Sequence, residues 1–213
     1  MKIFWINYIL ICIICYFTGA IPFAYLILKK KFHIDITKAG SGNVGAMNGY
    51  EISGSKKTGI LIFILDFLKG MIPSLVVLYV LKIPFQLAIL PILLLMAGHN
   101  YSVWLGFKGG RGLSTAAGIA VAVNFWMLVI WCSVYLITIN IKKNIHVANI
   151  AATILLPVIV ILPGNFFIKF SDRFSTGDNF PQVFFAFTAI LCGLIFIRHI
   201  GPLMEFFRSS VKK

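Results

Sequence analysis

The residues of this chain best suited to chemistry lie in a small, polar segment, G-S-G-N-V-G-A-M-N-G, from Gly40 to Gly49. Four of its ten residues are glycines and two are asparagines. Such a backbone can adopt left-handed conformations and point several amide N–H groups at one anion, because no bulky side chain blocks the approach. We therefore expect a phosphate-binding loop, called the first glycine loop below. Its candidate binding residues are Ser41, Gly42, Asn43, Gly45 and Asn48.

A second glycine loop, F-K-G-G-R-G from Phe107 to Gly112, adds two cations. Lys108 and Arg111 can hold a phosphate group and stabilise negative charge that develops during a reaction. We expect Arg111 to take part in catalysis. The candidate binding residues of this loop are Lys108, Gly109, Gly110 and Gly112.

Other glycine-loop motifs fit this sequence poorly. The first loop matches the dinucleotide-binding pattern at Gly40, Gly42 and Gly45, but that pattern needs a βαβ unit around it. Gly49 and Gly54 have the spacing of a Walker A loop, yet Ser55 stands where that motif needs lysine. We predict neither dinucleotide binding nor nucleotide hydrolysis.

Two further kinds of site are not expected. Acyltransferases that pair a histidine with an aspartate five residues later are excluded, since Trp104 follows His99 at that distance. Cysteines within apolar runs are expected to be small buried side chains rather than disulfides or metal ligands. The chain has four such cysteines: Cys12, Cys15, Cys132 and Cys192.

The composition places these loops in a membrane protein. The chain is 60% hydrophobic and 12% charged, with a mean hydropathy of +0.96. A soluble domain is usually about 45–50% apolar and about 25% charged. The net charge of +13 does not indicate nucleic-acid binding, because the basic residues lie between apolar runs rather than on a soluble module. We predict one polytopic membrane domain, 1–213.

Six apolar runs are long enough to cross a hydrocarbon layer of ~30 Å at about 1.5 Å per helical residue. The run 113–141 fits either one tilted helix or two short spans that meet at Asn124. If it is two, the first, Leu113–Val123, is only ~16 Å long and must lie in a thinned or tilted site or be shielded by other helices. The runs are 3–28, 58–81, 83–105, 113–141, 147–168 and 181–200.

Positive charge favours two spans. With seven spans, only Lys2, Lys82, Lys169 and Arg173 of the 19 Lys and Arg residues lie opposite the 29–57 loop, and Lys69 lies within a span. The other fourteen lie on the same side as that loop, whereas a single span would divide the charges ten to eight. Since Lys and Arg are in excess in cytoplasmic loops, we expect an all-α integral membrane fold with seven transmembrane helices. The N-terminus is then outside and the C-terminus cytoplasmic, and both glycine loops and all four histidines lie on the cytoplasmic face.

The second run carries two opposite charges, Asp66 and Lys69, three residues apart. That spacing puts them on one helix face, where they can pair. A single charge in hydrocarbon is costly, so pairing is expected. The favoured interpretation is a structural ion pair, and a direct catalytic role is the alternative.

Five stretches, in this order along the chain, resemble the bacterial acyl-phosphate:glycerol-3-phosphate acyltransferases, the PlsY family. The resemblance implies seven helices and a cytoplasmic active site in the bacterial cell membrane. It also implies transfer of a fatty acyl group from acyl phosphate to the 1-position of glycerol 3-phosphate, which gives lysophosphatidic acid for phospholipid biosynthesis. No metal or coenzyme A is implied. The stretches are Gly19–Phe23, Gly40–Asn48, Gly59–Pro73, Gly98–Gly112 and Arg198-His199.

This resemblance suggests how the candidate residues act. Acyl phosphate is already activated, so correct placement of the acceptor hydroxyl supplies much of the catalysis and no enzyme nucleophile is needed. His199 is then a candidate catalytic residue that positions or deprotonates the acceptor. The alternative is an interfacial histidine bonded to a neighbouring carbonyl group.

The chain departs from the family pattern mainly on the acceptor side. Family members usually have threonine in place of Met47, a basic residue in place of Glu51, lysine in place of Arg111 and asparagine in place of Pro202; they also have serine in the segment 145–149. A second interpretation is therefore a diverged, non-catalytic protein on the same fold that binds anions or lipids, or a transporter. The internal repeat common in transporters is not evident.

Overall fold

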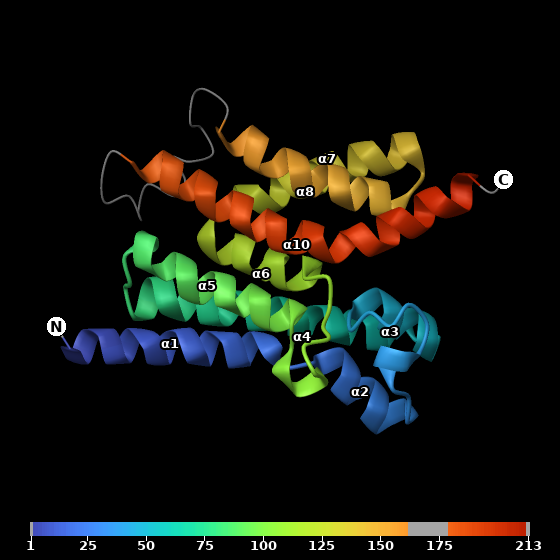
Figure 1. Ribbon diagram of the computed structural model, residues 1–213, viewed down its shortest axis with the longest axis horizontal. Coiled ribbons are helices and arrows are strands. Elements are labelled where there is room, and N and C mark those ends of the chain that lie inside the picture. Colours follow the sequence, from blue (N-terminus) through green and yellow to red (C-terminus); the bar gives the residue numbers. More distant parts are fainter. Residues whose placement is uncertain (1, 162–178, 212–213) are drawn as a thin grey trace. The chain divides into compact units, whose positions relative to one another are not determined.

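The structure is a computed structural model that describes residues 2–161 and 179–211, and these are almost entirely helical (Figure 1). An isolated antiparallel bridge joins Ser102 and Lys108. The chain divides into two compact units, Met1–Val123 and Asn124–Lys213. The single domain expected from the sequence stays a prediction.

The first unit holds both glycine loops. Its elements are α1 (Lys2–Ala20), α2 (Phe23–Phe32), η1 (Ile36–Lys38), α3 (Ala46–Ser53), α4 (Lys56–Leu75), η2 (Val76–Val80), α5 (Phe85–Asn100), η3 (Val103–Leu105) and α6 (Leu113–Val123). The second unit contains α7 (Phe125–Lys142), α8 (Ile145–Ile161) and α10 (Phe180–Val211).

The first apolar run is not one continuous helix. It divides into α1 and α2 at Ile21 and Pro22. Proline lacks a backbone N–H and disfavours the helical conformation of the residue before it, which accounts for the break. The two helices still follow each other closely enough that Ile3–Phe32 forms one candidate span.

Glycines allow the helices of the first unit to pack at very short distance. A Cβ atom at Gly19 of α1 would collide with the backbone of Leu95 in α5. In the same way, Gly70 of α4 packs on the Thr115 carbonyl group, and Gly118 of α6 packs on the backbone of α4. Small residues at helix contacts are typical of membrane proteins, where backbones must approach closely to gain packing energy.

The predicted division of run 113–141 at Asn124 is confirmed. Asn124 has an extended backbone, and its side chain accepts a hydrogen bond from the Trp126 backbone N at 2.9 Å, so that it caps α7. The preceding helix α6 has 11 residues, of which seven are buried, including Thr115, Gly118 and Val123. The short helix is therefore shielded by protein, which is one of the three arrangements expected for a span of this length.

Within the second unit, α7 and α8 are joined by a short turn and by a side-chain hydrogen bond. The Trp131 indole N–H donates to the Thr153 hydroxyl at 3.2 Å. Asn144, between the helices, accepts hydrogen bonds from the backbone N atoms of His146 and Val147 and so caps α8. The prediction of buried cysteine side chains is confirmed for Cys12, Cys15 and Cys192 and is wrong for Cys132, which is exposed.

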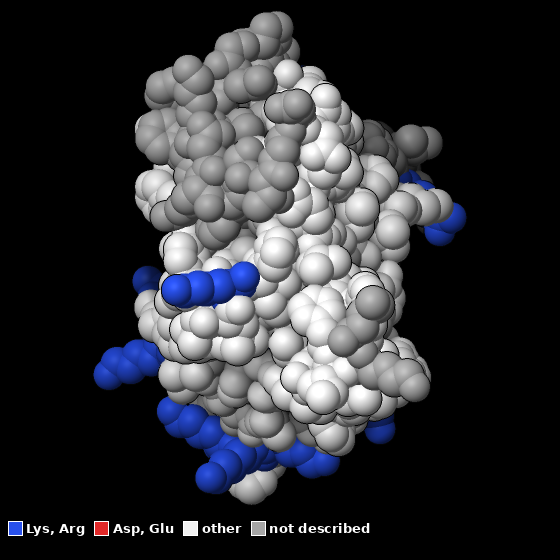
Figure 2. Space-filling model, turned by 90° about the vertical axis from the view of Figure 1, so that its left-hand side faces the viewer, with Lys and Arg blue, Asp and Glu red and all other residues white. Residues whose placement is uncertain are grey.

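Four helical segments of the described chain are long and apolar enough to cross a membrane: Ile3–Phe32, Lys56–Val80, Phe125–Lys142 and Phe180–Met204. Three shorter apolar helices, α5, α6 and α8, accompany them. On the face shown in Figure 2, Lys and Arg side chains project from the surface and no described Asp or Glu is visible.

Candidate functional site

The first glycine loop is built around the side chain of Asn48. Its amide nitrogen donates to the carbonyl oxygens of Ala39, at 3.2 Å, and Asn43, at 2.9 Å, while its Oδ1 accepts from the Ser41 backbone N at 3.1 Å. Asn48 is 2% exposed. These bonds assign Asn48, a predicted binding residue, to shaping the loop from the inside.

The glycines of the first loop differ in backbone conformation. Gly40 and Gly42 adopt left-handed backbone conformations, with φ of +57° and +67°. Residues other than glycine rarely adopt such conformations. Gly45 is extended and precedes the first turn of α3. Ser41 is exposed and Asn43 is half-buried, so both side chains lie at or near the surface.

Asp35 fixes the chain just before this loop. Its carboxylate accepts hydrogen bonds from the Thr37 hydroxyl at 2.6 Å and the Thr37 backbone N at 3.0 Å. The hydroxyl hydrogen bond is the main cause that lowers the pKa of Asp35, with help from the charge of Lys38. The cap is therefore lost only when the pH falls through this lowered pKa, and it is intact at neutral pH.

The second glycine loop begins with a tight turn that exposes its first residues. The Phe107 backbone N donates to the Ser102 carbonyl oxygen at 2.8 Å. Trp104 and Phe107 are 59% and 61% exposed, and Lys108 beside them is also exposed. Arg111 is half-buried.

The glycines of the second loop pack against the end of α5. A Cβ atom at Gly109 would collide with the His99 carbonyl oxygen, and one at Gly112 would collide with the side chain of Met96. Gly110 donates its backbone N–H to the His99 carbonyl oxygen at 3.1 Å. All three glycines are buried, so close packing requires glycine at these predicted binding positions, and at Gly112 the left-handed backbone, with φ of +87°, requires it as well.

Gly110 brings the two glycine loops together. A Cβ atom there would lie 2.8 Å from the Val44 carbonyl oxygen of the first loop and would collide with the His99 ring. The candidate binding residues of the two loops therefore lie on adjacent segments of one unit, beside Lys108 and Arg111. This proximity could not be inferred from the spacing of either motif.

The predicted catalytic residue His199 belongs to the second unit. It is 2% exposed, and its Nδ1 lies 2.9 Å from the carbonyl oxygen of Ile195, one turn earlier in α10. This contact is the kind that the alternative interpretation expected. The catalytic role of His199 stays a prediction.

The predicted ion pair between Asp66 and Lys69 is confirmed, and it has neighbours that the sequence analysis missed. Lys69 Nζ lies 2.8 Å from Asp66 Oδ1, and His99 Nδ1 lies 3.8 Å from the same oxygen. Ser102, also missed, donates to the Ala20 carbonyl oxygen at 2.6 Å. In the sequence, only the position of His99 at the polar end of an apolar run pointed to these neighbours of the ion pair.

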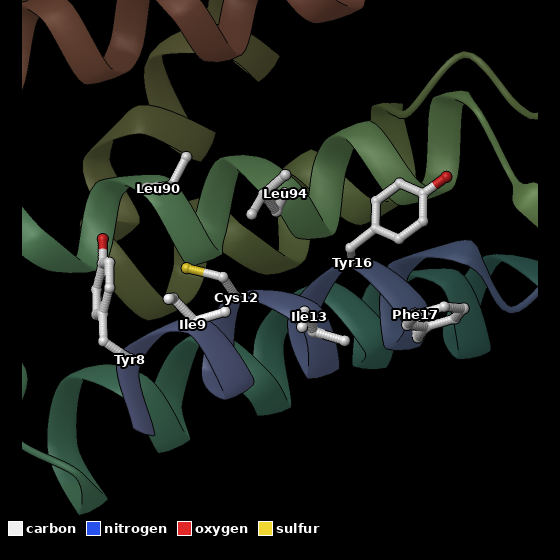
Figure 3. A pocket seen from close by; sticks show the side chains of 8 residues that line it. All are labelled: Tyr8, Ile9, Cys12, Ile13, Tyr16, Phe17, Leu90 and Leu94. Atoms are coloured by element: carbon white, nitrogen blue, oxygen red, sulfur yellow. The ribbon is translucent and has the colours of Figure 1, made fainter. Parts of the chain in front are cut away.

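An apolar groove of about 300 Å³ runs along α1 and α5 (Figure 3). At one end, the Tyr16 hydroxyl donates to the Tyr101 carbonyl oxygen at 2.8 Å, in the segment that joins α5 to the second loop. The groove thus leads along the helices toward that loop. Its lining residues are Tyr8, Ile9, Cys12, Ile13, Tyr16, Phe17, Leu90 and Leu94.

Comparison of the sequence with known proteins points to one family. A family model described as glycerol-3-phosphate acyltransferase matches residues 9–208. A glycerol-3-phosphate acyltransferase of Lactiplantibacillus plantarum is 35% identical over 153 residues, which cover 72% of this chain and 73% of the relative. One of Chlorobium phaeobacteroides is 30% identical over 214 residues, 91% of each chain.

Comparison of the fold with solved structures points to the same family. A crystal structure of PlsY, an integral membrane glycerol 3-phosphate acyltransferase in its glycerol 3-phosphate form, matches with a TM-score of 0.80 and 31% identity. It covers 95% of this chain and 93% of that one. The lysophosphatidic acid form matches with a TM-score of 0.77. The resemblance seen in the motifs is confirmed, and the chain belongs to the glycerol-3-phosphate acyltransferase family of integral membrane proteins.

Proposed function

We propose that this chain transfers a fatty acyl group from acyl phosphate to the 1-position of glycerol 3-phosphate. The observation that carries the proposal is the contact between the two glycine loops at Gly110 and Val44, in a chain of this family. Glycine-rich backbone and the cations Lys108 and Arg111 lie on these adjacent segments. Both substrates carry a phosphate group, and such a region can bind it.

In the proposed reaction, the acceptor hydroxyl oxygen attacks the acyl carbonyl carbon. An ester C–O bond forms as the bond between that carbon and the phosphate oxygen breaks, and inorganic phosphate leaves with the electron pair. Lys108 and Arg111 stabilise the negative charge on the carbonyl oxygen and on the departing phosphate. His199 takes the hydroxyl proton. The products are lysophosphatidic acid and phosphate.

The proposed topology has seven spans, an external N-terminus and a cytoplasmic active site in the bacterial cell membrane. The four long and three short apolar helices support this number, and so does the charge division between loops. The groove beside α1 and α5 supplies an apolar surface near the second loop, as a substrate with a long acyl chain requires.

The test is a radiolabelled assay of the purified protein with acyl phosphate and glycerol 3-phosphate. We expect labelled lysophosphatidic acid with acyl phosphate and none with acyl-coenzyme A in a parallel reaction. Arg111→Ala should lower kcat by about 10²-fold or more, since it removes a stabilising charge from the transition state. Lys82→Ala, which removes an exposed cation from another loop of the same unit, is the matched control.

The rival function is a non-catalytic anion- or lipid-binding protein or a transporter. It predicts no product with either donor, even when the purified protein is folded and binds glycerol 3-phosphate. That result would overturn the proposed acyl transfer.

A further inference from the structure

The break between α1 and α2 is bonded by side chains from two other elements. The last carbonyl groups of a helix have no donors within it, and an apolar environment offers no water in their place. Here the Ser102 hydroxyl donates to the Ala20 carbonyl oxygen at 2.6 Å, and Lys69 Nζ donates to the Ile21 carbonyl oxygen at 2.8 Å. The end of α1 is therefore tied to α4 and to the segment that joins α5 to the second loop.

Lys69 is a buried cation that pairs with the carboxylate of Asp66. Lys69 is 6% exposed and Asp66 2% exposed, with 2.8 Å between Nζ and Oδ1. Lys69 also lies 5.5 Å from the ring centroid of Phe23, the first residue of α2. Two apolar side chains would fill this space without desolvating two charges. The ion pair is better explained by the hydrogen bond that Lys69 donates to the Ile21 carbonyl oxygen at the α1–α2 break.

His99 extends this cluster to the glycine loops. Its Nδ1 lies 3.8 Å from Asp66 Oδ1, and the other side of its ring packs against Gly110. Gly110 is bonded through its N–H to the His99 carbonyl oxygen and lies beside Val44. A displacement of His99 would therefore move the point where the loops meet.

The helix α2 supports the first loop from another side. Ala24 and Leu28 of α2 form one buried cluster with Ile36, Val44 and Ile62. Val44 lies within the first loop, so the direction of α2 and the position of that loop depend on each other. Lys69 and Ser102 donate hydrogen bonds to the break between α1 and α2, and the position of this break determines where α2 begins.

We propose that Asp66, Lys69, His99 and Ser102 form a positioning cluster that fixes the α1–α2 break and thereby sets the spacing of the two glycine loops. Its members act through the loops, so that the groups that bind phosphate are in place before the substrate arrives. This inference rests on the function proposed above.

Four variants separate positioning from simple stability. Lys69→Met leaves Asp66 unpaired, Asp66→Asn/Lys69→Met removes both charges, and Ser102→Ala removes only the hydroxyl bond to Ala20. Ser74→Ala is the matched control, because Ser74 is buried in the same helix and its hydroxyl donates to the Gly70 carbonyl oxygen of that helix. KM for glycerol 3-phosphate, kcat and the melting temperature are measured on folded, purified protein.

We expect Lys69→Met to lower yield and melting temperature, since it leaves an unpaired buried charge. The double variant should recover both, yet keep a KM raised between about 10-fold and 100-fold, because small displacements of binding groups have effects of this size. Ser102→Ala should raise KM in the same direction, and Ser102→Thr should restore it. A double variant with wild-type KM and kcat would overturn the inference and leave Lys69 and Asp66 only a structural role.

A second readout does not depend on acyl transfer. Hydrogen exchange of the segments 39–49 and 101–112 should be faster in the double variant than in Ser74→Ala, while exchange in α7 and α8 is unchanged. Inorganic phosphate should raise the melting temperature of wild type more than that of the double variant. If wild type shows no turnover, the proposed function fails while these measurements still decide the inference. Unchanged exchange in both segments would overturn it.

Discussion

Gly42 and Gly54 share a left-handed backbone but differ in what surrounds them. Their φ angles are +67° and +63°, so an alanine at either position strains the backbone by about 1 kcal/mol. Gly42 lies in the first glycine loop, where a Cβ atom would lie 3.3 Å from the Thr37 carbonyl oxygen. Gly54 ends α3 and has open space around it.

The pair gives a controlled test of the phosphate-binding loop. We expect both Gly42→Ala and Gly54→Ala to lower the melting temperature through the same backbone strain, with a further small loss at Gly42 from the close Thr37 carbonyl oxygen. Only Gly42→Ala should greatly reduce acyl transfer, and Gly42→Val should abolish it in a correctly inserted protein, because a Cβ atom narrows the anion's approach. Equal activity in the two alanine variants would reject a binding role for this loop.

Glu51 is an exposed carboxylate on α3, close in sequence to the loop proposed to bind a phosphate dianion. Like charges at about 4 Å repel by ~1 kcal/mol even in water. Glu51→Arg should therefore lower KM for glycerol 3-phosphate and change KM for the donor little, with Glu51→Gln intermediate. Steady-state kinetics with each substrate varied in turn measure this. No change in either variant would mean that Glu51 points away from the acceptor.

At the scale of elements, the turn between α7 and α8 reports the topology. Asn144 caps α8, so a cysteine probe there would lose a helix cap of about 1 kcal/mol. Lys142 is exposed and makes no such cap, which makes it the better probe position. In a cysteine-free background, Lys142→Cys should be protected from an impermeant thiol reagent added outside intact cells.

The matched probe is Lys82→Cys, in the exposed turn between η2 and α5. Seven spans place this turn on the opposite side of the membrane, where the same reagent should label it. Ready labelling at Lys142 from outside would contradict the proposed cytoplasmic position of this turn and of the C-terminus.

For the whole molecule, the net charge of +13 predicts a salt effect on substrate binding. A surface with one predominant sign of charge raises the local concentration of anions, and salt screens this attraction. KM for glycerol 3-phosphate should rise between about 0.01 M and about 0.5 M salt, where the screening length falls from roughly 30 Å to below 10 Å. Sucrose of equal osmolality should leave KM unchanged; a flat salt profile would argue against such attraction.

Local signals in the sequence predicted most elements of the fold. A polar residue within an apolar run made Asn124 a candidate break, and the division of positive charge between the loops favoured it. Helical spacing predicted the pair Asp66–Lys69, because that pair depends on residues close in the chain. The contact of Gly110 with Val44 and the bond from Ser102 to Ala20 join residues far apart, and no periodicity encodes such contacts. Sequence also could not show that Asn48 is turned inward.

Trp104 and Phe107 flank the turn that exposes Lys108. Tryptophan prefers the boundary between hydrocarbon and headgroups, so we expect Trp104 to set the depth of this turn in the membrane. The cationic loop then stays at the level of the headgroups of its own leaflet, whatever the thickness of the bilayer. In a thicker bilayer the helices are too short for the hydrocarbon layer and the lipid around them has to thin, whereas in a thinner bilayer the helices tilt. In both cases we expect the distance between the loop and the head of a lipid-like donor to stay constant.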